Sequence, residues 1–474
     1  MRSMTFYGLV LALLLFPSPL LTTELSGTEG AVKRPNILIM MADDMGITDA
    51  SCYNGNAQTA RIDRLANEGI RYTNFYSGAS NGSPTRAAML TGRTPSRVGV
   101  YDSLVADAPM RLPETEITIP KLLKPLGYDT AHFGKWHLAT YNEKNTMLEG
   151  TPDKHGYDYW FGCANNAAPS HFQPNNYHRN GIRLKKDGYA CQEVAAESIK
   201  WLRSRKNKEH PFFMTVWYNE PHVKLAAPEN LIHKYMAAGF HQEALYYATI
   251  ENMDIASGRI LDVLDELKLR ENTLVLFTSG NGPELFKTSS DPFRMKKLFL
   301  YEGGIRVPGI VRWPGHAEGG KISDVPIGFV DLLPTLVSIA GGTVPTDRTI
   351  DGENVLPALH GKPLVRTKPL FWYFYKFEPL CALRDGDYKI TATTDDFANA
   401  NTTKIWQFSQ QNQVFIKSAK LTRFELYNLK NDPSETTDIA ATEPEIFAAL
   451  QEKIIAFHAE MIRESPEWEG LPSD

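Results

Sequence analysis

Two adjacent carboxylates, Asp43 and Asp44, directly follow an apolar run in this sequence. Carboxylate oxygens are hard ligands, and a pair of them at the end of a strand suits Ca²⁺ or Mg²⁺. An isolated Asp-Asp pair is more often a solvated turn, because polar residues are common in loops. Two further polar groups, residues 219–222 and 279–282, also follow apolar runs. The chemistry of the pair therefore depends on the side chains that the fold places beside it.

The three apolar runs before these polar groups are typical of strands that are buried on both faces. They span residues 36–42, 212–218 and 273–278. Helical patterns lie between them, at residues 62–68, 119–126, 195–205 and 246–267. Strands that alternate with helices predict an α/β fold with a doubly wound, mostly parallel large sheet. Because ligands bind beyond the carboxyl ends of such strands, we expect the polar groups to line one pocket.

Residues 77–93 carry a motif that resembles a known family signature. They read Ser-Gly-Ala-Ser-Asn-Gly-Ser-Pro-Thr-Arg-Ala-Ala-Met-Leu-Thr-Gly-Arg. The formylglycine-dependent (type I) sulfatases of the alkaline-phosphatase superfamily have Cys/Ser-x-Pro-x-Arg followed by Leu-Thr-Gly-Arg. Residues 134–137, Gly-Lys-Trp-His, match a second segment of that family, and the resemblance runs from Arg34 to the final helix. It implies a sulfatase-like fold and the hydrolysis of sulfuric esters.

The resemblance places a glycine at the position of the nucleophile. In the family, the Cys or Ser of the signature is oxidised to an aldehyde, and its hydrate attacks sulfur. Counting back four places from Arg86 puts this position on Gly82, which has no side chain to oxidise. No formylglycine is therefore expected, and the loss of a covalent nucleophile can cost on the order of 10⁶-fold in kcat. Ser80 and Ser83 are close in sequence, but neighbouring residues on a tight loop project in different directions.

The remaining positions of the family pattern are nearly complete. The resemblance implies that Lys135, His222 and Lys297 bind the sulfate, and that His222 is a candidate acid for the leaving oxygen. His137 would help to break down the sulfated intermediate. The predicted catalytic set is Gly82, Arg86, Lys135, His137, His222 and Lys297. Cationic side chains and a bound cation would stabilise the negative charge that grows as the S–O bond breaks.

The predicted metal site lacks one ligand. The resemblance assigns Asp43, Asp44 and Asn281 as ligands, but Gly280 stands where the family's Ser-Asp-Asn-Gly has a metal-binding Asp. We expect one Ca²⁺ ion, with Mg²⁺ as the alternative, at a weakened site, because affinity depends on the number of ligand charges. Taken singly, Gly82 and Gly280 could each be a harmless turn residue.

The sequence changes character near residue 366. Residues 371–375, 388–393 and 424–429 predict short strands, and residues 443–463 predict a closing amphipathic helix. This pattern is typical of a small α+β subdomain with an antiparallel sheet, and it resembles the C-terminal subdomain of sulfatases. We therefore divide the chain into a sulfatase-like catalytic domain, 34–365, and a C-terminal subdomain, 366–474.

The N-terminal residues predict export. One early positive charge precedes an apolar run at residues 6–21, which is typical of a secretory signal peptide. Pro17 and Pro19 break this run and leave it short for a membrane span. We assign residues 1–23 as the signal peptide, with cleavage somewhere in 22–32. The protein is then secreted or periplasmic, with no stable membrane insertion after cleavage.

Composition narrows the class of partner. The net charge of −5 argues against a nucleic-acid partner, which would favour a strongly basic face. The sequence has four cysteines: Cys52, Cys163, Cys191 and Cys381. Their spacing resembles no zinc site, and the sequence leaves open whether and how they pair in disulfides.

Three functions remain open from the sequence. The first is an exported sulfuric ester hydrolase that acts on sulfated carbohydrates or aryl sulfates, with its usual turnover lost or weak. The second is a non-catalytic protein that binds a sulfated glycan or another anion. The third is a phosphate-ester hydrolase of the same superfamily, although the Pro-Thr-Arg and Leu-Thr-Gly-Arg segments favour sulfatases. Residues 347–352, followed by Leu356-Pro357, resemble arylsulfatase-like enzymes such as N-acetylgalactosamine-6-sulfatase.

Overall fold

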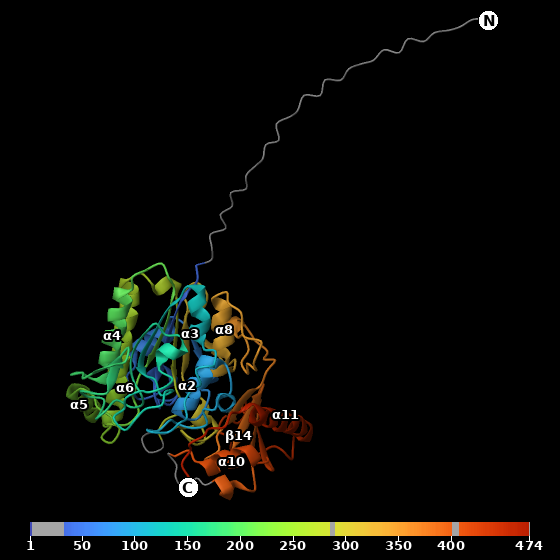
Figure 1. The fold of residues 1–474 in the computed structure, drawn as a ribbon. Helices are drawn as coiled ribbons and strands as arrows, with labels where there is room; N and C mark the ends of the chain where they lie inside the picture. Colours follow the sequence, from blue (N-terminus) through green and yellow to red (C-terminus); the bar gives the residue numbers. More distant parts are fainter. Residues whose placement is uncertain (2–32, 285–289, 401–406, 474) are drawn as a thin grey trace. The chain divides into compact units, whose positions relative to one another are not determined.

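The computed structural model describes residues 1, 33–284, 290–400 and 407–473. The predicted signal peptide lies outside the described residues, apart from Met1. Arg34–Asp474 form one compact unit, which contains all the sheets (Figure 1). No helix in the described part of the chain combines the length and the apolar character that a membrane crossing requires.

A ten-stranded mixed sheet forms the centre of this unit, in the order β11-β2-β10-β9-β1-β8-β4-β5-β6-β7. Its strands are β1 Asn36–Ala42, β2 Ile70–Tyr72, β4 Asp129–Lys135, β5 Tyr159–Cys163, β6 Tyr177–Arg179, β7 Ile182–Leu184, β8 Phe212–Trp217, β9 Thr273–Ser279, β10 Gly309–Arg312 and β11 Lys321–Ser323. The three predicted strands are β1, β8 and β9, and β1 pairs in parallel with both of the others. Their carboxyl ends therefore share one edge of the sheet, as predicted.

Helices cover both faces of the large sheet. The α-helices are α1 Ala60–Asn67, α2 Gly82–Thr91, α3 Ile119–Leu123, α4 Ala190–Ser204, α5 Glu229–Ala237, α6 Ala244–Glu266, α7 Glu302–Ile305, α8 Leu332–Ile339, α9 Leu356–Leu359, α10 Gln410–Ser418 and α11 Pro444–Glu464. Figure 1 shows α4, α5 and α6 on one side and α2, α3 and α8 on the other. This two-sided packing confirms the doubly wound α/β prediction.

Strand β1 shows why the sheet needs both layers of helices. All seven of its residues are buried. Ile37 and Ile39 pack in one apolar cluster with α2 and α8, whereas Leu38 and Met40 pack in a second cluster with α4 and α6. Successive side chains of a strand point to opposite faces, so a continuous apolar run requires cover on both sides.

The C-terminal part contains a four-stranded antiparallel sheet, in the order β13-β14-β15-β16. Its strands are β13 Leu370–Tyr373, β14 Cys381–Asp385, β15 Tyr388–Thr393 and β16 Arg423–Asn428. Helix α11 follows, at the position of the predicted closing helix, and contacts β14 and β15. The sequence prediction missed β14 and α10. The division of the chain at residue 365 stays a prediction.

Two smaller features complete the fold. Strands β3 Phe75–Tyr76 and β12 Ile327–Gly328 pair in parallel as a separate two-stranded sheet. All four cysteines lie in the described part of the chain, and each is a free thiol.

Candidate functional site

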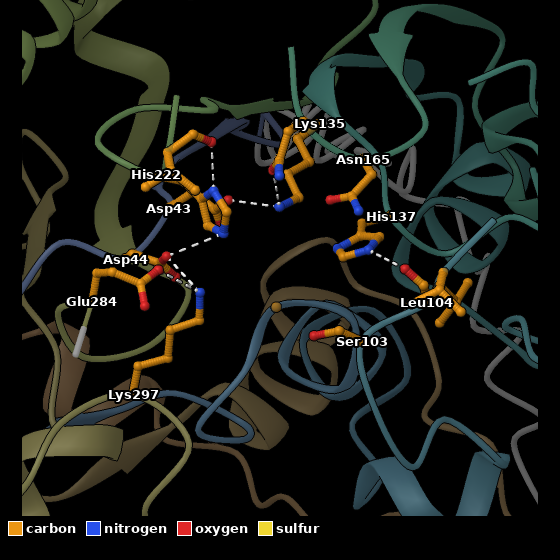
Figure 2. A pocket seen from close by; sticks show the side chains of 14 residues that line it. Asp43, Asp44, Ser103, Leu104, Lys135, His137, Asn165, His222, Glu284 and Lys297 are labelled. Atoms are coloured by element: carbon orange, nitrogen blue, oxygen red, sulfur yellow. Dashed lines mark hydrogen bonds and ion pairs between the residues drawn. The ribbon is translucent and has the colours of Figure 1, made fainter. Parts of the chain in front are cut away.

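A cavity of about 500 Å³ lies beyond the carboxyl ends of the central strands (Figure 2). Seven of the predicted site residues line it: Asp43, Asp44, Gly82, Lys135, His137, His222 and Lys297. Two other predicted residues, Arg86 and Asn281, are buried behind the wall and hydrogen-bond to its carboxylates. The structure thus brings the predicted residues together, while their individual roles stay predictions.

Asp43, just after β1, accepts hydrogen bonds from two cationic side chains. Lys135 Nζ at the end of β4 lies 2.8 Å from Asp43 Oδ2, and Arg86 Nη2 from α2 lies 3.1 Å from Asp43 Oδ1. All three side chains are at most 2% exposed. Burial alone would raise the pKa of Asp43, but the charges of Lys135 and Arg86 outweigh it and hold the pKa well below its usual value. Asp43 is therefore ionised at neutral pH.

Asp44 lies beside Asp43 and has a left-handed backbone conformation, with φ of 66°. Asn281 Nδ2 donates to Asp44 Oδ1 over 2.8 Å, and Lys297 Nζ donates to Asp44 Oδ2 over 2.7 Å. Lys297 also contacts Glu284 Oε2 at 3.1 Å. Burial opposes ionisation of Asp44, but Lys297 outweighs it and lowers the pKa. Each aspartate therefore has its own lysine.

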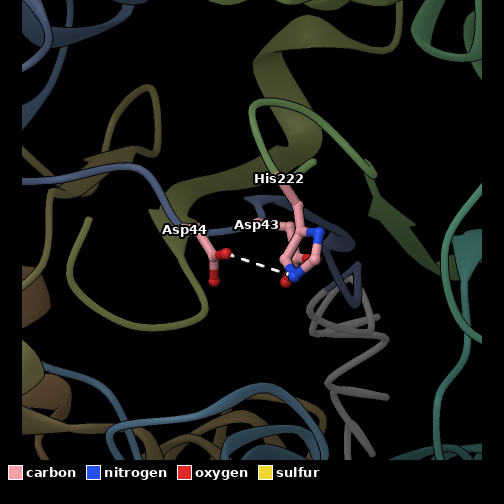
Figure 3. Close-up of side chains that lie close together, drawn as sticks. All are labelled: Asp43, Asp44 and His222. Atoms are coloured by element: carbon pink, nitrogen blue, oxygen red, sulfur yellow. Dashed lines mark ion pairs between the residues drawn. The ribbon is translucent and has the colours of Figure 1, made fainter. Parts of the chain in front are cut away.

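His222 contributes a neutral imidazole to this wall (Figure 3). Its Nδ1 lies 2.7 Å from Val223 O, and a carbonyl oxygen only accepts, so Nδ1 carries the ring proton. Its Nε2 lies 3.4 Å from Asp44 Oδ2. Burial lowers the pKa of His222 to about 4. The predicted role as an acid would therefore need a second proton, which this environment disfavours at neutral pH.

The oxygen ligands of the candidate metal site are of the type that a hard cation prefers, but they are few. Ligand atoms of Asp43, Asp44 and His222 lie within 4.8 Å of one another. Asn281 Oδ1 is buried and has no hydrogen-bond partner among the described residues, so it is available as a third oxygen. However, all four oxygens of the two aspartates already accept hydrogen bonds. A cation would have to compete with the ammonium groups of Lys135 and Lys297.

Gly280 lies where a further carboxylate could reach the same centre. A Cβ on Gly280 would stand 3.5 Å from Thr85 Cγ2 and 3.7 Å from Asp43 Oδ1, which are ordinary contact distances. The backbone N–H of Gly280 is already bonded to Ala42 O at the end of β1. The backbone here can therefore carry a Cβ without rearrangement, and it is the side chain that is missing.

Gly82 begins helix α2, which is buried along its whole length. A Cβ on Gly82 would stand 3.0 Å from Arg86 Nη1 and 3.5 Å from His137 Nδ1, so it would point into the cationic wall. The helix ends at Thr91, and Gly92 of the Leu-Thr-Gly-Arg segment caps it with the positive φ of 69° that glycine adopts easily. The signature thus builds a helix whose first residue faces the cavity.

Neither nearby serine replaces the missing side chain in this geometry. Ser83 and Ser80 are fully buried. Ser83 Oγ accepts a hydrogen bond from Leu104 N over 3.1 Å, and Ser83 does not line the cavity, whereas Gly82 does. This arrangement agrees with the expectation that Ser80 and Ser83 project in directions different from that of a side chain at position 82.

One lining residue, Glu284, follows the Asn281-Gly282 turn closely enough for the sequence to suggest it as a source of the missing metal oxygen, and in the structure it contacts Lys297. Sequence reasoning missed other lining residues. Asn166 Oδ1 accepts from Lys135 Nζ at 2.9 Å, and the apolar part of the lining includes Leu104 and Val223. These apolar residues belong to no motif, because any apolar side chain can serve there.

The fold and the cavity define an α/β protein with a pocket of paired lysines and carboxylates at the carboxyl edge of its sheet. Residues 35–342 match the family model described as sulfatase, and residues 293–460 match the C-terminal model of N-sulphoglucosamine sulphohydrolase. Human N-acetylgalactosamine-6-sulfatase is 32% identical over 439 residues, covering 85% of this chain and 79% of the relative. Human steryl-sulfatase is 29% identical, covering 89% and 87%.

Solved structures agree with this assignment. The crystal structure of Ps i-CgsB in complex with k-i-k-neocarrahexaose has a TM-score of 0.76 and 25% identity, covering 90% of this chain and 93% of that one. This chain belongs to the sulfatase family.

Proposed function

We propose that this protein is an exported member of the sulfatase family that binds the sulfate group of a sulfated carbohydrate or aryl sulfate in the pocket and has no formylglycine-dependent turnover. The observation that carries the proposal is the position of Gly82. A side chain there would project toward Arg86, His137 and Asp43, but glycine offers no atom for oxidation or attack. The binding groups around it are present.

Charge supports sulfate binding. Lys135, Lys297 and Arg86 supply three positive charges within a largely buried wall, and the ionised Asp43 and Asp44 offset two of them. Electrostatic attraction is stronger in this wall than in water, so the remaining positive charge favours an anion. A sulfate ester that approached Lys135 and Lys297 would take over hydrogen bonds that the aspartates now accept. The names of the relatives support sulfated carbohydrates or steryl sulfates as the substrate class.

We include a divalent cation, Ca²⁺ before Mg²⁺, as a weakly bound component. Asp43, Asp44 and the buried Oδ1 of Asn281, which has no hydrogen-bond partner in the described part of the chain, would hold it. Such an ion would offset the negative charge of a bound sulfate. Two carboxylates are few for a tight Ca²⁺ site, which uses six to eight oxygen ligands.

Calorimetric titration of the purified chain with inorganic sulfate and with phenyl sulfate tests the binding. We expect saturable binding of both, and at least a tenfold loss of affinity in Lys135→Met. The exposed Lys206→Met serves as the matched control and keeps the wild-type affinity. An absence of binding by the folded wild type would refute the proposal, and tighter binding of phosphate would favour the phosphate-ester alternative.

Export has a separate test. Expression of the full chain, followed by fractionation and N-terminal sequencing, should give a product outside the cytoplasm that begins within residues 22–32. A cytoplasmic product with an intact N-terminus would contradict this part of the proposal.

A further inference from the structure

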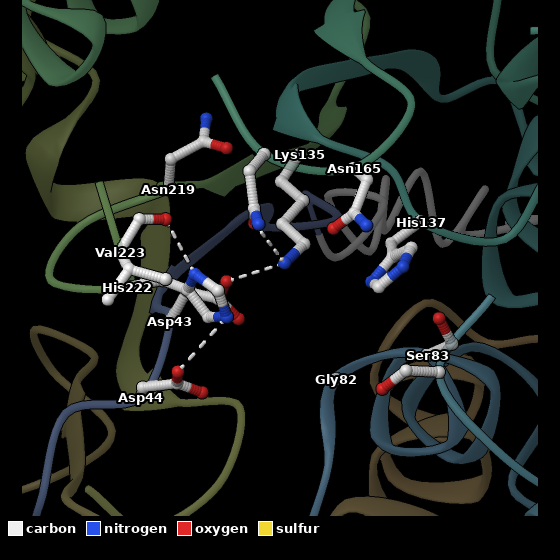
Figure 4. A network of polar contacts seen from close by, with 12 residues as sticks. Asp43, Asp44, Gly82, Ser83, Lys135, His137, Asn165, Asn219, His222 and Val223 are labelled. Atoms are coloured by element: carbon white, nitrogen blue, oxygen red, sulfur yellow. Dashed lines mark hydrogen bonds and ion pairs between the residues drawn. The ribbon is translucent and has the colours of Figure 1, made fainter. Parts of the chain in front are cut away.

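His137 lines the pocket near Gly82 (Figure 4). Its Nε2 lies 2.8 Å from Leu104 O, and because a carbonyl only accepts, Nε2 carries the ring proton. Nδ1 is then an acceptor, and it is buried without a hydrogen-bond partner among the described residues. Burial, reinforced by Lys135 and Arg86, lowers the pKa of His137 well below its usual value. The imidazole is therefore neutral, with a free lone pair.

The space beside Gly82 is bordered by complementary groups. The point that a Cβ would occupy lies 3.0 Å from Arg86 Nη1, 3.5 Å from His137 Nδ1 and 3.9 Å from Asp43 Oδ1. A water oxygen is close in size to a methyl group, and a buried water needs two to four polar partners. Water near this point would accept from Arg86 and donate to His137 Nδ1. It would also lie at the N-terminus of α2, whose backbone dipole favours negative charge.

We propose that a water molecule held beside Gly82 by Arg86 and His137 is the nucleophile of a slow hydrolysis of sulfate esters that needs no formylglycine. This inference rests on the proposed function, because the sulfate must first bind in the pocket. His137 is the base in this reaction. Lys135, whose Nζ lies 2.8 Å from Asp43 Oδ2, would face the bound sulfate.

The step balances without a further reactant. The water oxygen forms a bond to sulfur while one of its protons passes to His137 Nδ1. The ester S–O bond breaks, and its electron pair leaves on the phenol or alcohol oxygen. The products are hydrogensulfate and the phenolate or alkoxide, and His137 returns its proton to solvent.

The rate is low for a physical reason. A histidine with a strongly lowered pKa is a weak base, so it orients the water more than it activates it. Group transfer through a loose transition state depends more on positioning and charge stabilisation than on the strength of the nucleophile. We expect aryl sulfates with acidic phenols to react first, because their leaving groups need no proton, at rates well below the roughly 1 s⁻¹ of ordinary enzymes.

Alanine at position 82 gives a direct test. Its Cβ would fill the space of the proposed water, yet it adds no charge and contacts only the end of the Arg86 side chain closely. With 4-nitrophenyl sulfate at high protein concentration, we expect slow hydrolysis by the wild type and at least a tenfold loss in Gly82→Ala. His137→Asn should lose activity similarly, because it removes the imidazole that accepts the proton. This variant should still fold, because asparagine tolerates the positive φ of 56° at this position. Gly188→Ala is the matched control and keeps the wild-type rate, because its Cβ would stand 2.7 Å from Glu193 Oε1, at the end of a side chain that can move aside.

Binding and isotope measurements separate the outcomes. Sulfate affinity and melting temperature, measured on each variant, should stay near the wild-type values in Gly82→Ala. In ¹⁸O-water, the sulfate should gain one solvent oxygen and the phenol none. Hydrolysis that is absent in a wild type that binds sulfate, or that survives unchanged in Gly82→Ala, would overturn this inference and leave the proposed function standing. A wild type that does not bind sulfate would instead refute the proposed function.

Discussion

Lys297 Nζ lies 2.7 Å from Asp44 Oδ2, and neither side chain is more than 5% exposed. Lys135 makes the equivalent contact with Asp43, so each acidic residue of the candidate metal site is neutralised by its own lysine. Removing one partner of such a pair leaves an uncompensated buried charge, which is strongly unfavourable. Cation binding and the two lysines are therefore coupled through the same carboxylate oxygens.

Replacing Lys297 should strengthen Ca²⁺ binding. In Lys297→Met, Asp44 loses its ammonium partner, so a cation no longer competes for Oδ2. We expect about a tenfold gain in Ca²⁺ affinity, equivalent to ~1.4 kcal/mol, by calorimetry. Without Ca²⁺ the variant should melt at a lower temperature than the wild type, and Ca²⁺ should raise its melting temperature more. An unchanged affinity, with Lys206→Met as the control, would show that Lys297 does not compete with the ion.

A carboxylate at position 280 should also strengthen the site. The Cβ of Gly280→Asp would stand 3.7 Å from Asp43 Oδ1 without a close contact, and the new side chain adds one ligand charge. We expect Ca²⁺ affinity at least tenfold above that of the wild type in calorimetric titration. Gly280→Asn, similar in size but uncharged, separates ligand charge from packing. Equal affinities in Gly280→Asp and the wild type would sink the idea that this position limits metal binding.

Asp49 should make the protein less stable as the pH rises from acid toward neutrality. Burial raises its pKa to about 7 from the usual 3.8, although Tyr246 and Gly46 donate hydrogen bonds to it. Between these values the folded protein binds more protons than the unfolded chain, so the free energy of unfolding falls by roughly 1 kcal/mol per pH unit. Asp49→Asn should remove this part of the slope in denaturant titrations from pH 4 to pH 7. The exposed Asp187→Asn should leave the slope unchanged, and a wild-type slope in Asp49→Asn would contradict the assignment.

The central strands could be predicted because their pattern is strong. Residues 36–42 form a continuous apolar run that only a doubly covered strand accommodates, and they form β1 as predicted. Strand β14, Cys381–Asp385, was missed although both of its partners are near in sequence: Asp385 pairs with Tyr388 across a short turn, and β13 ends at Tyr373. Its five residues carry too little periodicity to identify it.

The candidate site was also predictable only in part. Residue types and motif order placed Asp43, Lys135 and Lys297 in one pocket. The pairing of each lysine with an aspartate could not be predicted, because it joins positions 92 and 253 residues apart and depends on side-chain geometry. The tautomer of His137 is fixed by the carbonyl of Leu104, a residue outside every motif.

The last prediction concerns restored turnover. Gly82→Cys, produced together with the formylglycine-generating enzyme, should gain hydrolysis of 4-nitrophenyl sulfate, because Pro84 and Arg86 of that enzyme's recognition pattern are present. The new Cβ lies 3.0 Å from Arg86 Nη1, so the guanidinium must shift by a few tenths of an ångström, and only part of a family-like rate is expected. Mass spectrometry of the peptide that contains residue 82 shows whether the aldehyde forms.

Two matched variants make this prediction specific. Gly82→Ala places a Cβ at the same point but cannot be oxidised, so it should stay inactive under the same conditions. Gly280→Asp combined with Gly82→Cys should raise the rate further. The combined effect should exceed the sum of the single effects in free energy, because a nucleophile and a cation site that act on one sulfate group are coupled. A Gly82→Cys protein that carries the aldehyde, binds sulfate and still shows no gain would mean that position 82 is not the determinant of turnover.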